Sequence, residues 1–342
     1  MNILIIGPSW VGDSVMAQSL YIQLKKEDPN CNIDVVSPPW TASIIERMPQ
    51  VTRNISSPFL HGDIKLISRN RFGKSLMKFN YDRSIILTNS FKSALVPYFA
   101  KIPIRTGWLG EFRYGLLNDI RKLDPTKNYL MVEKFVSLSL QDNNGSLESL
   151  DFPSLTIDLV NQKNVLNKLS IDSSSRSLAI CPGAEFGPAK KWPPEYYAEL
   201  ARAYIEKGWN ILCLGSANDK ETGEKIESFH YLNKDIKFYN LIGKTDLNDA
   251  IDILGLCDKV VTNDSGLMHI AAAVGTPLVA LYGPSSPAYT PPLTDSKKIL
   301  RKMEGYEKKR EGDLERGYHK SLLAIKPTEV INALEEIGNC DE

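Results

Sequence analysis

The stretch Val261-Thr-Asn-Asp-Ser-Gly-Leu-Met-His-Ile-Ala-Ala-Ala273, followed by Tyr282-Gly-Pro284, carries the most information about the fold. Its β-branched residues predict a buried strand over 259–262, and the apolar run from Ser265 predicts a helix. Asp264 or Ser265 is a suitable N-cap, so the free N–H groups and the positive end of the helix face whatever lies beyond the strand. The stretch therefore predicts a strand–turn–helix unit with an anion site at its turn.

Two side chains are expected to flank this anion site. His269 lies four residues after Ser265, one helical turn further on, and Asp264 comes directly before the helix. Backbone amides can bind a phosphate, and a neighbouring carboxylate can accept hydrogen bonds from sugar hydroxyls. This combination suits a nucleotide-sugar as the ligand. The alternative is a well-capped core helix without a ligand, because Asp is common at N-caps.

Strands and helices alternate outward from this unit in both halves of the chain. Apolar runs predict strands over 2–6, 32–37, 84–88, 178–181, 210–214 and 278–282. Helical patterns are predicted over 12–26, 91–100, 194–207, 219–229, 247–256, 265–274 and 327–337. This alternation predicts an α/β fold with two Rossmann-like domains that face each other across a cleft.

The domain boundaries follow from length and composition. A chain of 342 residues exceeds one usual domain. We expect a first domain over 1–157, a polar linker over 158–176 that includes Asp172-Ser-Ser-Ser175, and a second domain over 177–326. The final helix, within 327–342, could belong to either domain and could pack back on the first.

Global composition restricts the class of protein. Lys plus Arg and Asp plus Glu are both 41, so the global charge says nothing about partners, and we expect no nucleic-acid partner. The cysteines at 31, 181, 213 and 257 sit in or beside apolar runs, without CxxC pairs, as expected of reduced buried thiols in a cytoplasmic protein. Met1 leads directly into a strand, so we expect no signal peptide, and no apolar run is long enough to span a membrane.

Local charge is more informative. Between His61 and Lys122 there are 12 basic and four acidic residues. This excess predicts a surface for a polyanion. The alternative is a solvated face whose charge is balanced elsewhere in the fold.

The first loop, Gly7-Pro-Ser-Trp-Val-Gly-Asp13, follows a strand and opens a helix. It is not a P-loop, because Asp13 stands where a lysine is needed, and it is not a dinucleotide fingerprint, because Ser9 replaces the middle glycine. The helix end should favour the ionised form of Asp13, which makes Asp13 a candidate general base. The alternative is simple helix capping.

In the second half, Cys181-Pro-Gly-Ala-Glu-Phe-Gly-Pro-Ala-Lys-Lys-Trp-Pro193 connects a strand to a helix. Lys190 or Lys191 can reach phosphates gathered at the Ser265 helix end. Glu221 follows the next strand, in a position where an acidic residue commonly binds ribose hydroxyls. The alternative for Glu221 is a favourable charge in the first helical turn.

The chain resembles the lipopolysaccharide heptosyltransferases, glycosyltransferase family 9, which have the GT-B fold. The resemblance covers nearly the whole chain, and its motifs occur in the order of the family. They are Gly7-Pro-Ser-Trp-Val-Gly-Asp13, Asn89-Ser-Phe-Lys-Ser-Ala-Leu-Val-Pro97, Arg105-Thr-Gly-Trp108, Arg113-Tyr-Gly-Leu-Leu-Asn-Asp119, Pro182-Gly-Ala-Glu-Phe-Gly-Pro-Ala-Lys190, Thr262-Asn-Asp-Ser-Gly-Leu-Met-His269 and Tyr282-Gly-Pro-Ser-Ser286.

The resemblance implies inverting transfer of L-glycero-D-manno-heptose from ADP-heptose onto the first heptose of the lipopolysaccharide inner core, which is carried on Kdo2-lipid A. It implies Asp13 as the catalytic base and no cofactor. The residues that it assigns to the donor are Gly12, Lys190, Glu221, Asp264, Ser265, Gly266 and His269. The residues expected to bind the phosphorylated acceptor are Arg69, Arg71, Lys74, Lys92 and Arg105.

The sequence has no DxD motif or His/carboxylate cluster, so we expect no metal and stabilisation of the leaving ADP by Lys190 and the helix N–H groups. Domain closure would bring Asp13 to the donor. The implied location is the cytoplasmic face of the inner membrane, with peripheral contact through the acceptor.

Four alternatives remain open. One is transfer of the first heptose instead of the second. A GT-B sugar-nucleotide epimerase or hydrolase would need no polyanion surface, and a Rossmann oxidoreductase would need the missing glycine fingerprint. A carbohydrate-binding scaffold would not need Asp13.

Overall fold

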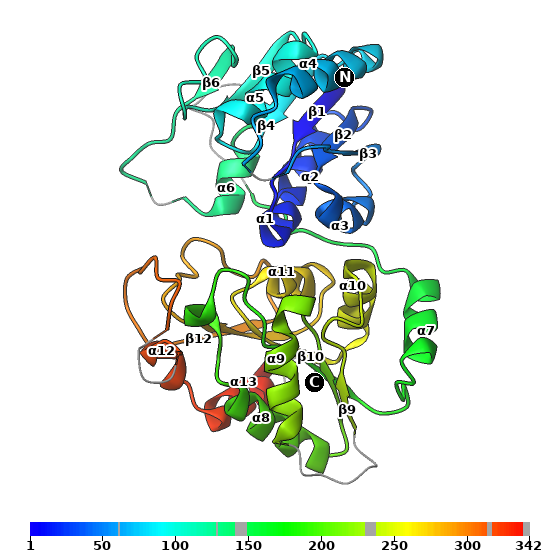
Figure 1. Cartoon of the computed structure of the whole chain (residues 1–342), viewed down its shortest axis with the longest axis vertical. Coiled ribbons are helices and arrows are strands. Elements are labelled where there is room, and N and C mark those ends of the chain that lie inside the picture. Colours follow the sequence, from blue (N-terminus) through cyan, green and yellow to red (C-terminus); the bar gives the residue numbers. More distant parts are fainter. Residues whose placement is uncertain (61, 128, 141–148, 230–236, 313–316, 338–342) are drawn as a thin grey trace. The chain divides into compact units, whose positions relative to one another are not determined.

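The computed structural model describes residues 1–60, 62–127, 129–140, 149–229, 237–312 and 317–337. The chain divides into two compact units, Met1–Leu155 and Thr156–Glu342. Each unit contains one six-stranded sheet with helices packed against it, and all strand pairs are parallel (Figure 1). The predicted α/β class with two parallel sheets is confirmed.

The sheet of the first unit has the order β3-β2-β1-β4-β5-β6. After Asn2, its central strand β1 consists of buried Ile and Leu residues, as expected for a parallel strand covered on both faces. The strands are β1 (Asn2–Ile6), β2 (Asn32–Ser37), β3 (Arg53–Ser56), β4 (Arg83–Ile86), β5 (Ile104–Trp108) and β6 (Asp119–Arg121). The helices are α1 (Val11–Met16), α2 (Gln18–Glu27), η1 (Pro39–Thr41), α3 (Ala42–Glu46), α4 (Leu66–Leu76), η2 (Met77–Phe79), α5 (Phe91–Phe99) and α6 (Met131–Val136).

The sheet of the second unit has the order β12-β11-β10-β7-β8-β9. Its strands are β7 (Ser177–Cys181), β8 (Asn210–Cys213), β9 (Phe238–Asn240), β10 (Lys259–Asn263), β11 (Leu278–Tyr282) and β12 (Lys297–Arg301). Its helices are α7 (Leu159–Lys168), η3 (Pro188–Lys190), α8 (Pro194–Glu206), η4 (Ala217–Asp219), α9 (Lys220–Ser228), α10 (Leu247–Leu256), α11 (Gly266–Ala273), α12 (Lys320–Leu323) and α13 (Pro327–Ile337).

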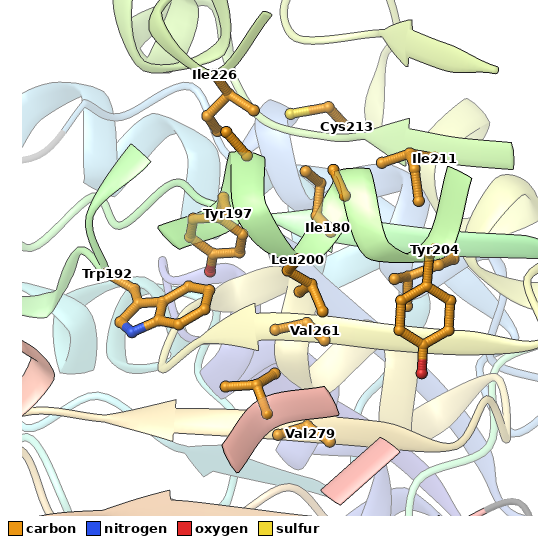
Figure 2. Close-up of a cluster of buried hydrophobic side chains, with 14 of the residues drawn as sticks. Ile180, Trp192, Tyr197, Leu200, Tyr204, Ile211, Cys213, Ile226, Val261 and Val279 are labelled. Carbon is orange, nitrogen blue, oxygen red and sulfur yellow. The ribbon is translucent and has the colours of Figure 1, made fainter. Parts of the chain in front are cut away.

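The core of the second unit lies between its sheet and helices α8 and α13. Figure 2 shows Tyr197, Leu200 and Tyr204 of α8 pointing at the strand residues, with Trp192 beside them. The rings of Trp192 and Tyr197 meet edge to face, with centroids 4.8 Å apart. Helix α13, which the sequence left open between the two domains, contacts α8, β11 and β12 of the second unit.

Several elements differ from the sequence expectations. The single helix expected over 12–26 is two helices, α1 and α2, which join at Ala17. The expected linker contains α7, whose N-cap Asp158 accepts hydrogen bonds from Val160 and Asn161. Asn161 also donates to Asp252 of α10 at 2.8 Å, so this segment is a structured part of the second unit.

Four cysteines, at 31, 181, 213 and 257, are buried free thiols, which confirms the expectation for them. Cys340 lies outside the described residues. No helix among the described residues is long and apolar enough to cross a membrane.

Candidate active site

In each sheet the first three strands of the unit extend the sheet toward one edge, and the last three extend it toward the opposite edge. In the first sheet this change of direction lies between β1 and β4, and in the second between β7 and β10. Ligands of open parallel sheets bind at the carboxyl ends of the strands at such a switch point. The loop with Asp13 leaves β1, the loop with Lys190 leaves β7, and Asp264 follows β10, so the predicted residues lie at the expected positions within each unit.

The first loop is held by its neighbours in the first unit. The Gly7 N–H donates to the Val36 carbonyl at 2.9 Å, and the Trp40 indole donates to the Ser9 carbonyl at 2.8 Å. Helix α1 then begins at Val11, so Gly12 and Asp13 lie in its first turn. Asp13 is partly buried there.

Burial raises the pKa of Asp13 from its ordinary value near 3.8 to about 6. The helix end was expected to favour the ionised form of Asp13, and burial acts in the opposite direction. The pKa rises because removal of water from the carboxylate disfavours its charged form. A carboxyl with a pKa near 6 is still mostly ionised at neutral pH and is a stronger base than an exposed aspartate.

In the second unit the central feature is an ion pair between two of the predicted residues. The Lys190 Nζ atom lies 2.5 Å from Asp264 Oδ2, and the two side chains are 19% and 6% exposed. Lys190 ends η3, and Asp264 is in the turn after β10. The fold therefore brings together two groups that are 74 positions apart in the sequence.

Asn263 ties the Lys190 loop to the Asp264 turn. Its Oδ1 accepts hydrogen bonds from the backbone N–H of Trp192 at 3.2 Å and from the Tyr197 hydroxyl at 3.1 Å. Its Nδ2 donates to the Pro182 carbonyl at 2.8 Å. The sequence analysis did not single out Asn263; a polar residue at the end of an apolar strand, just before the turn, was the available signal.

The helix after this turn, α11, begins at Gly266 with Ser265 as its N-cap. Ser265 has an extended backbone and makes no side-chain capping bond, and Asp264 is committed to Lys190. Ser265 is therefore the N-cap residue, as one of the two predicted positions, but its side chain makes no capping hydrogen bond. Because no side chain caps α11, its first-turn N–H groups retain their capacity to bind an anion.

His269 is a buried residue on α11. Burial lowers its pKa to about 4, although the nearby Asp264 carboxylate acts in the opposite direction. The imidazole is therefore neutral at physiological pH and contributes no positive charge to an anion site.

The loop after β8 and the start of α9 carry two acidic residues, the predicted Glu221 and also Asp219. Glu221 lies in the first turn of α9, its side chain is 81% exposed, and it pairs with Lys225 at 2.7 Å, as an ordinary helix surface residue does. Asp219 is buried, and its carboxylate binds Lys191 at 2.8 Å and the Ser216 hydroxyl at 2.8 Å.

The Asp219 carboxylate also fits closely against Gly183, where an added Cβ would lie 2.4 Å from Oδ2. Asp219 therefore joins the loop after β8 to the loop after β7. The sequence analysis missed this residue; the capping-box spacing from Ser216 to Asp219 was the signal that could have found it.

The basic stretch of the first unit is less exposed than the sequence suggested. Arg69 is 6% exposed and donates to the Ile64 and Asp63 carbonyls, with its guanidinium 4.0 Å from the centre of the Phe59 ring. Arg105 donates to the Leu116 and Ile102 carbonyls. The expectation that Arg69 belongs to an exposed anion-binding surface is wrong, and Arg105 is at least partly a structural residue.

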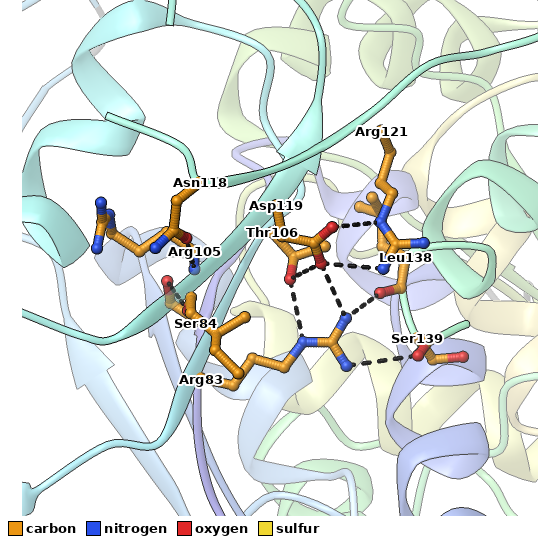
Figure 3. A network of polar contacts seen from close by, with 10 residues as sticks. Arg83, Ser84, Arg105, Thr106, Asn118, Asp119, Arg121, Leu138 and Ser139 are labelled. Atoms are coloured by element: carbon orange, nitrogen blue, oxygen red, sulfur yellow. Dashed lines mark hydrogen bonds and ion pairs between the residues drawn. The ribbon is translucent and has the colours of Figure 1, made fainter. Parts of the chain in front are cut away.

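Further arginines of the stretch are internal. Figure 3 shows Arg83 and Arg121 converging on Asp119, with the Arg121 Nε 2.8 Å from its carboxylate. Arg83 also donates to Thr106 at 3.0 Å and to the Leu138 carbonyl at 2.8 Å. These charges are neutralised or bonded inside the unit. Of the five predicted acceptor residues, Arg71 and Lys74 are exposed and Lys92 is partly exposed.

No group of three or more His, Cys, Asp or Glu side chains within the described ranges is arranged to hold a metal ion. The candidate site of the second unit is thus a lysine–carboxylate pair at an uncapped helix start, and that of the first unit is a carboxyl of raised pKa. The lysine–carboxylate pair at the helix start can bind a diphosphate, and the carboxyl of raised pKa can accept a proton.

Comparisons with known proteins give one consistent family. The family model of glycosyltransferase family 9 (heptosyltransferase) matches residues 69–319. Lipopolysaccharide heptosyltransferase 2 of Escherichia coli K12 is 45% identical over 342 residues, which is 98% of both chains. Lipooligosaccharide heptosyltransferase 2 of Haemophilus influenzae is 48% identical and covers 98% of this chain and 99% of its own. The solved structure of E. coli ADP-heptose LPS heptosyltransferase II superposes with a TM-score of 0.88 at 43% identity, over 98% of both chains.

Proposed function

The chain belongs to glycosyltransferase family 9, the heptosyltransferases, and on that premise we propose that it transfers L-glycero-D-manno-heptose from ADP-heptose onto the first heptose of the lipopolysaccharide inner core. The chain is a glycosyltransferase of GT-B fold, and its relatives at 45–48% identity are heptosyltransferases 2. The observation that carries the choice of donor is the Lys190–Asp264 pair beside the uncapped start of α11, because it offers a cation and N–H groups to a diphosphate.

The donor diphosphate binds to the Lys190 ammonium and to the N–H groups of Ser265 and Gly266. Negative charge builds up on the leaving ADP as the bond between the anomeric carbon and the phosphate oxygen breaks. Groups already fixed in place stabilise that charge without reorganisation, which lowers the barrier. Asp264 accepts hydrogen bonds from sugar hydroxyls once a phosphate shares its lysine.

The acceptor hydroxyl attacks the anomeric carbon from the side opposite ADP, so the configuration at that carbon inverts. A new carbon–oxygen bond forms as the bond to ADP breaks, and the hydroxyl proton passes to Asp13. A pKa of about 6 leaves Asp13 ionised at neutral pH and makes it a better proton acceptor than an exposed aspartate.

The acceptor is a phosphorylated core saccharide linked to lipid A. Arg71, Lys74 and Lys92 remain as its candidate ligands, because their side chains are exposed or partly exposed. This acceptor would bring the protein to the cytoplasmic face of the inner membrane as a peripheral protein.

An assay of ADP release tests the proposed function. We expect rapid release from ADP-heptose with lipopolysaccharide core that carries the first heptose, and slow release with core that lacks it. The opposite preference would assign transfer of the first heptose. Equal release without any acceptor would instead assign a sugar-nucleotide hydrolase.

A further inference from the structure

A surface of the first unit combines exposed apolar and basic side chains. We call it the α4 surface. It comprises the exposed apolar residues Leu60, Ile64, Leu66 and Ile67 and the exposed basic residues Arg71, Lys74 and Lys78. The four apolar side chains are 65%, 66%, 52% and 78% exposed, within eight positions of sequence. Scattered exposed apolar residues are ordinary, but such a cluster on a monomer marks a binding surface.

The segment is firmly packed on its other side. Gly73 lies so close to α5 that an added Cβ would be 2.7 Å from the Phe99 Cβ and the Val96 carbonyl. Leu76 is buried in the core, and Arg69 is bonded to the preceding loop. Leu66 and Ile67 are therefore exposed on a helix whose inner face is already filled, and Leu60 and Ile64 are exposed in the segment that leads into it.

The exposed side of α4 has one consistent chemistry along its length. Ile67, Arg71, Lys74 and Lys78 follow one another at spacings of four, three and four residues, which places them on one face of the helix and its continuation η2. Ile67 begins that face and the basic residues continue it, while Leu66 is the adjacent helix position and Leu60 and Ile64 lie in the segment just before the helix. This is the pattern of a segment that lies in the interface of an anionic bilayer, with apolar groups at the acyl boundary and Lys or Arg at the phosphates.

The same segment leaves the carboxyl end of β3, the edge of the parallel sheet from which the Asp13 loop leaves β1. A bilayer bound there would present a lipid-linked saccharide at the edge where the candidate base lies.

We propose that the α4 surface binds directly to an anionic phospholipid bilayer, independently of the acceptor saccharide. The occupant is a membrane and not a protein, because exposed basic residues follow directly on the exposed apolar residues and match anionic headgroups in charge. The proposal rests on the proposed function in one respect: a lipid-linked acceptor gives the enzyme a reason to reside at a membrane.

Flotation of the full chain with vesicles that contain no acceptor tests the proposal. We expect binding to vesicles of phosphatidylethanolamine and phosphatidylglycerol in equal parts, and weak binding to phosphatidylcholine alone. The double variant Ile64→Ser, Ile67→Ser should lose at least about tenfold in partitioning. Neutralising Arg71, Lys74 and Lys78 to Gln should lose roughly a hundredfold, and binding should weaken with salt.

A matched control is the double variant Leu159→Ser, Val160→Ser. These residues are 70% exposed on α7, where polar Asn161 and Gln162 follow them. This control should keep parental binding, and thermal unfolding should show that all variants are folded. Absence of binding to anionic vesicles by the parent, or equal losses for the α7 control, overturns the proposal. Self-association that the Ile64 and Ile67 substitutions abolish, without vesicle binding, would assign the surface to a second copy of the chain.

A second readout separates this proposal from the proposed function. ADP release by the Ile64→Ser, Ile67→Ser variant should match the parent with a water-soluble core saccharide and fall with acceptor embedded in vesicles. If the parent releases no ADP with either acceptor, the proposed function fails, while flotation still decides the membrane proposal.

Discussion

The Lys190 ammonium lies 2.5 Å from the Asp264 carboxylate, at the carboxyl edge of the second sheet. This pair positions the lysine before any ligand arrives, because the side chain is already held in one geometry. A donor diphosphate then adds its oxygens to a cation that is in place, at the start of a helix whose N–H groups no side chain caps. Asp264 directly precedes the N-cap of α11, so the ion pair holds Lys190 beside the N–H groups at the helix start. The proposed donor site depends on this lysine and on these N–H groups.

Replacing Lys190 by Ala should weaken ADP binding by about 1.5–3 kcal/mol, because a hydrogen-bonded ion pair to a phosphate is lost. Calorimetric titration with ADP measures this as a rise in Kd of roughly 10- to 150-fold. Lys207→Ala is the matched control, since Lys207 lies beyond the other end of α8 and pairs with Glu335. An unchanged Kd for Lys190→Ala would place the diphosphate elsewhere.

Replacing Asp13 by Asn keeps its shape and removes its basicity, so turnover should fall roughly 10²- to 10⁴-fold with ADP affinity little changed. In the parent, kcat/KM should rise with pH through about 6 and then level off, because the carboxyl must lose its proton to act as a base. The residual activity of the Asn variant should lack that rise. Near-normal turnover of the variant would falsify the role of Asp13 as the base.

Replacing Arg71 and Lys74 together by Gln should raise the KM for a water-soluble phosphorylated core saccharide and leave the donor KM unchanged. Both side chains are exposed, so their attraction is screened over about 8 Å at physiological ionic strength. The parental acceptor KM should therefore increase with salt more steeply than that of the variant. Identical salt dependence in both proteins would mean that these residues form only a solvated face.

Arg69→Ala should lower the free energy of unfolding and leave acceptor binding unchanged. The guanidinium is buried over Phe59 and bonded to two carbonyls, so its removal should cost about 2 kcal/mol of unfolding free energy. Arg71→Ala, two residues away on the exposed side, should remain within about 0.5 kcal/mol of the parent. Urea unfolding measures both, and equal stabilities of the two variants would contradict the structural role of Arg69.

His269→Gln tests the buried neutral imidazole. The folded pKa of about 4 lies below the unfolded value near 6.5, so the unfolded chain binds more protons between these values and stability falls as pH drops. Between pH 7 and pH 5 this histidine should cost the parent about 2 kcal/mol that the Gln variant does not lose. Unfolding in urea at the two pH values gives the difference, and parallel losses in both proteins would contradict the buried neutral state.

The central strands and several helices could be predicted because their sequences carry the signal themselves. β1, β2, β11, α10 and α13 begin and end at the predicted residues. Strands buried on both faces are continuous apolar runs, and amphipathic helices repeat every three or four residues. Short edge strands such as β3 and β9 were missed, since a strand of three or four partly polar residues forms only because a neighbour pairs with it.

In the candidate site, too, local features could be predicted from the sequence, and features that depend on tertiary contacts could not. Sequence alone located the loop of Asp13, the turn of Asp264 and the approach of Lys190, because strand ends and glycine-rich turns are local features. The tertiary structure decided which charges are available: it buried Arg69 and Arg121, paired Arg83 with Asp119, exposed Glu221, and raised the pKa of Asp13. Burial and pairing depend on residues far apart in the chain, and the free energy of a charge depends on the water and partners around it and not on its position in the sequence.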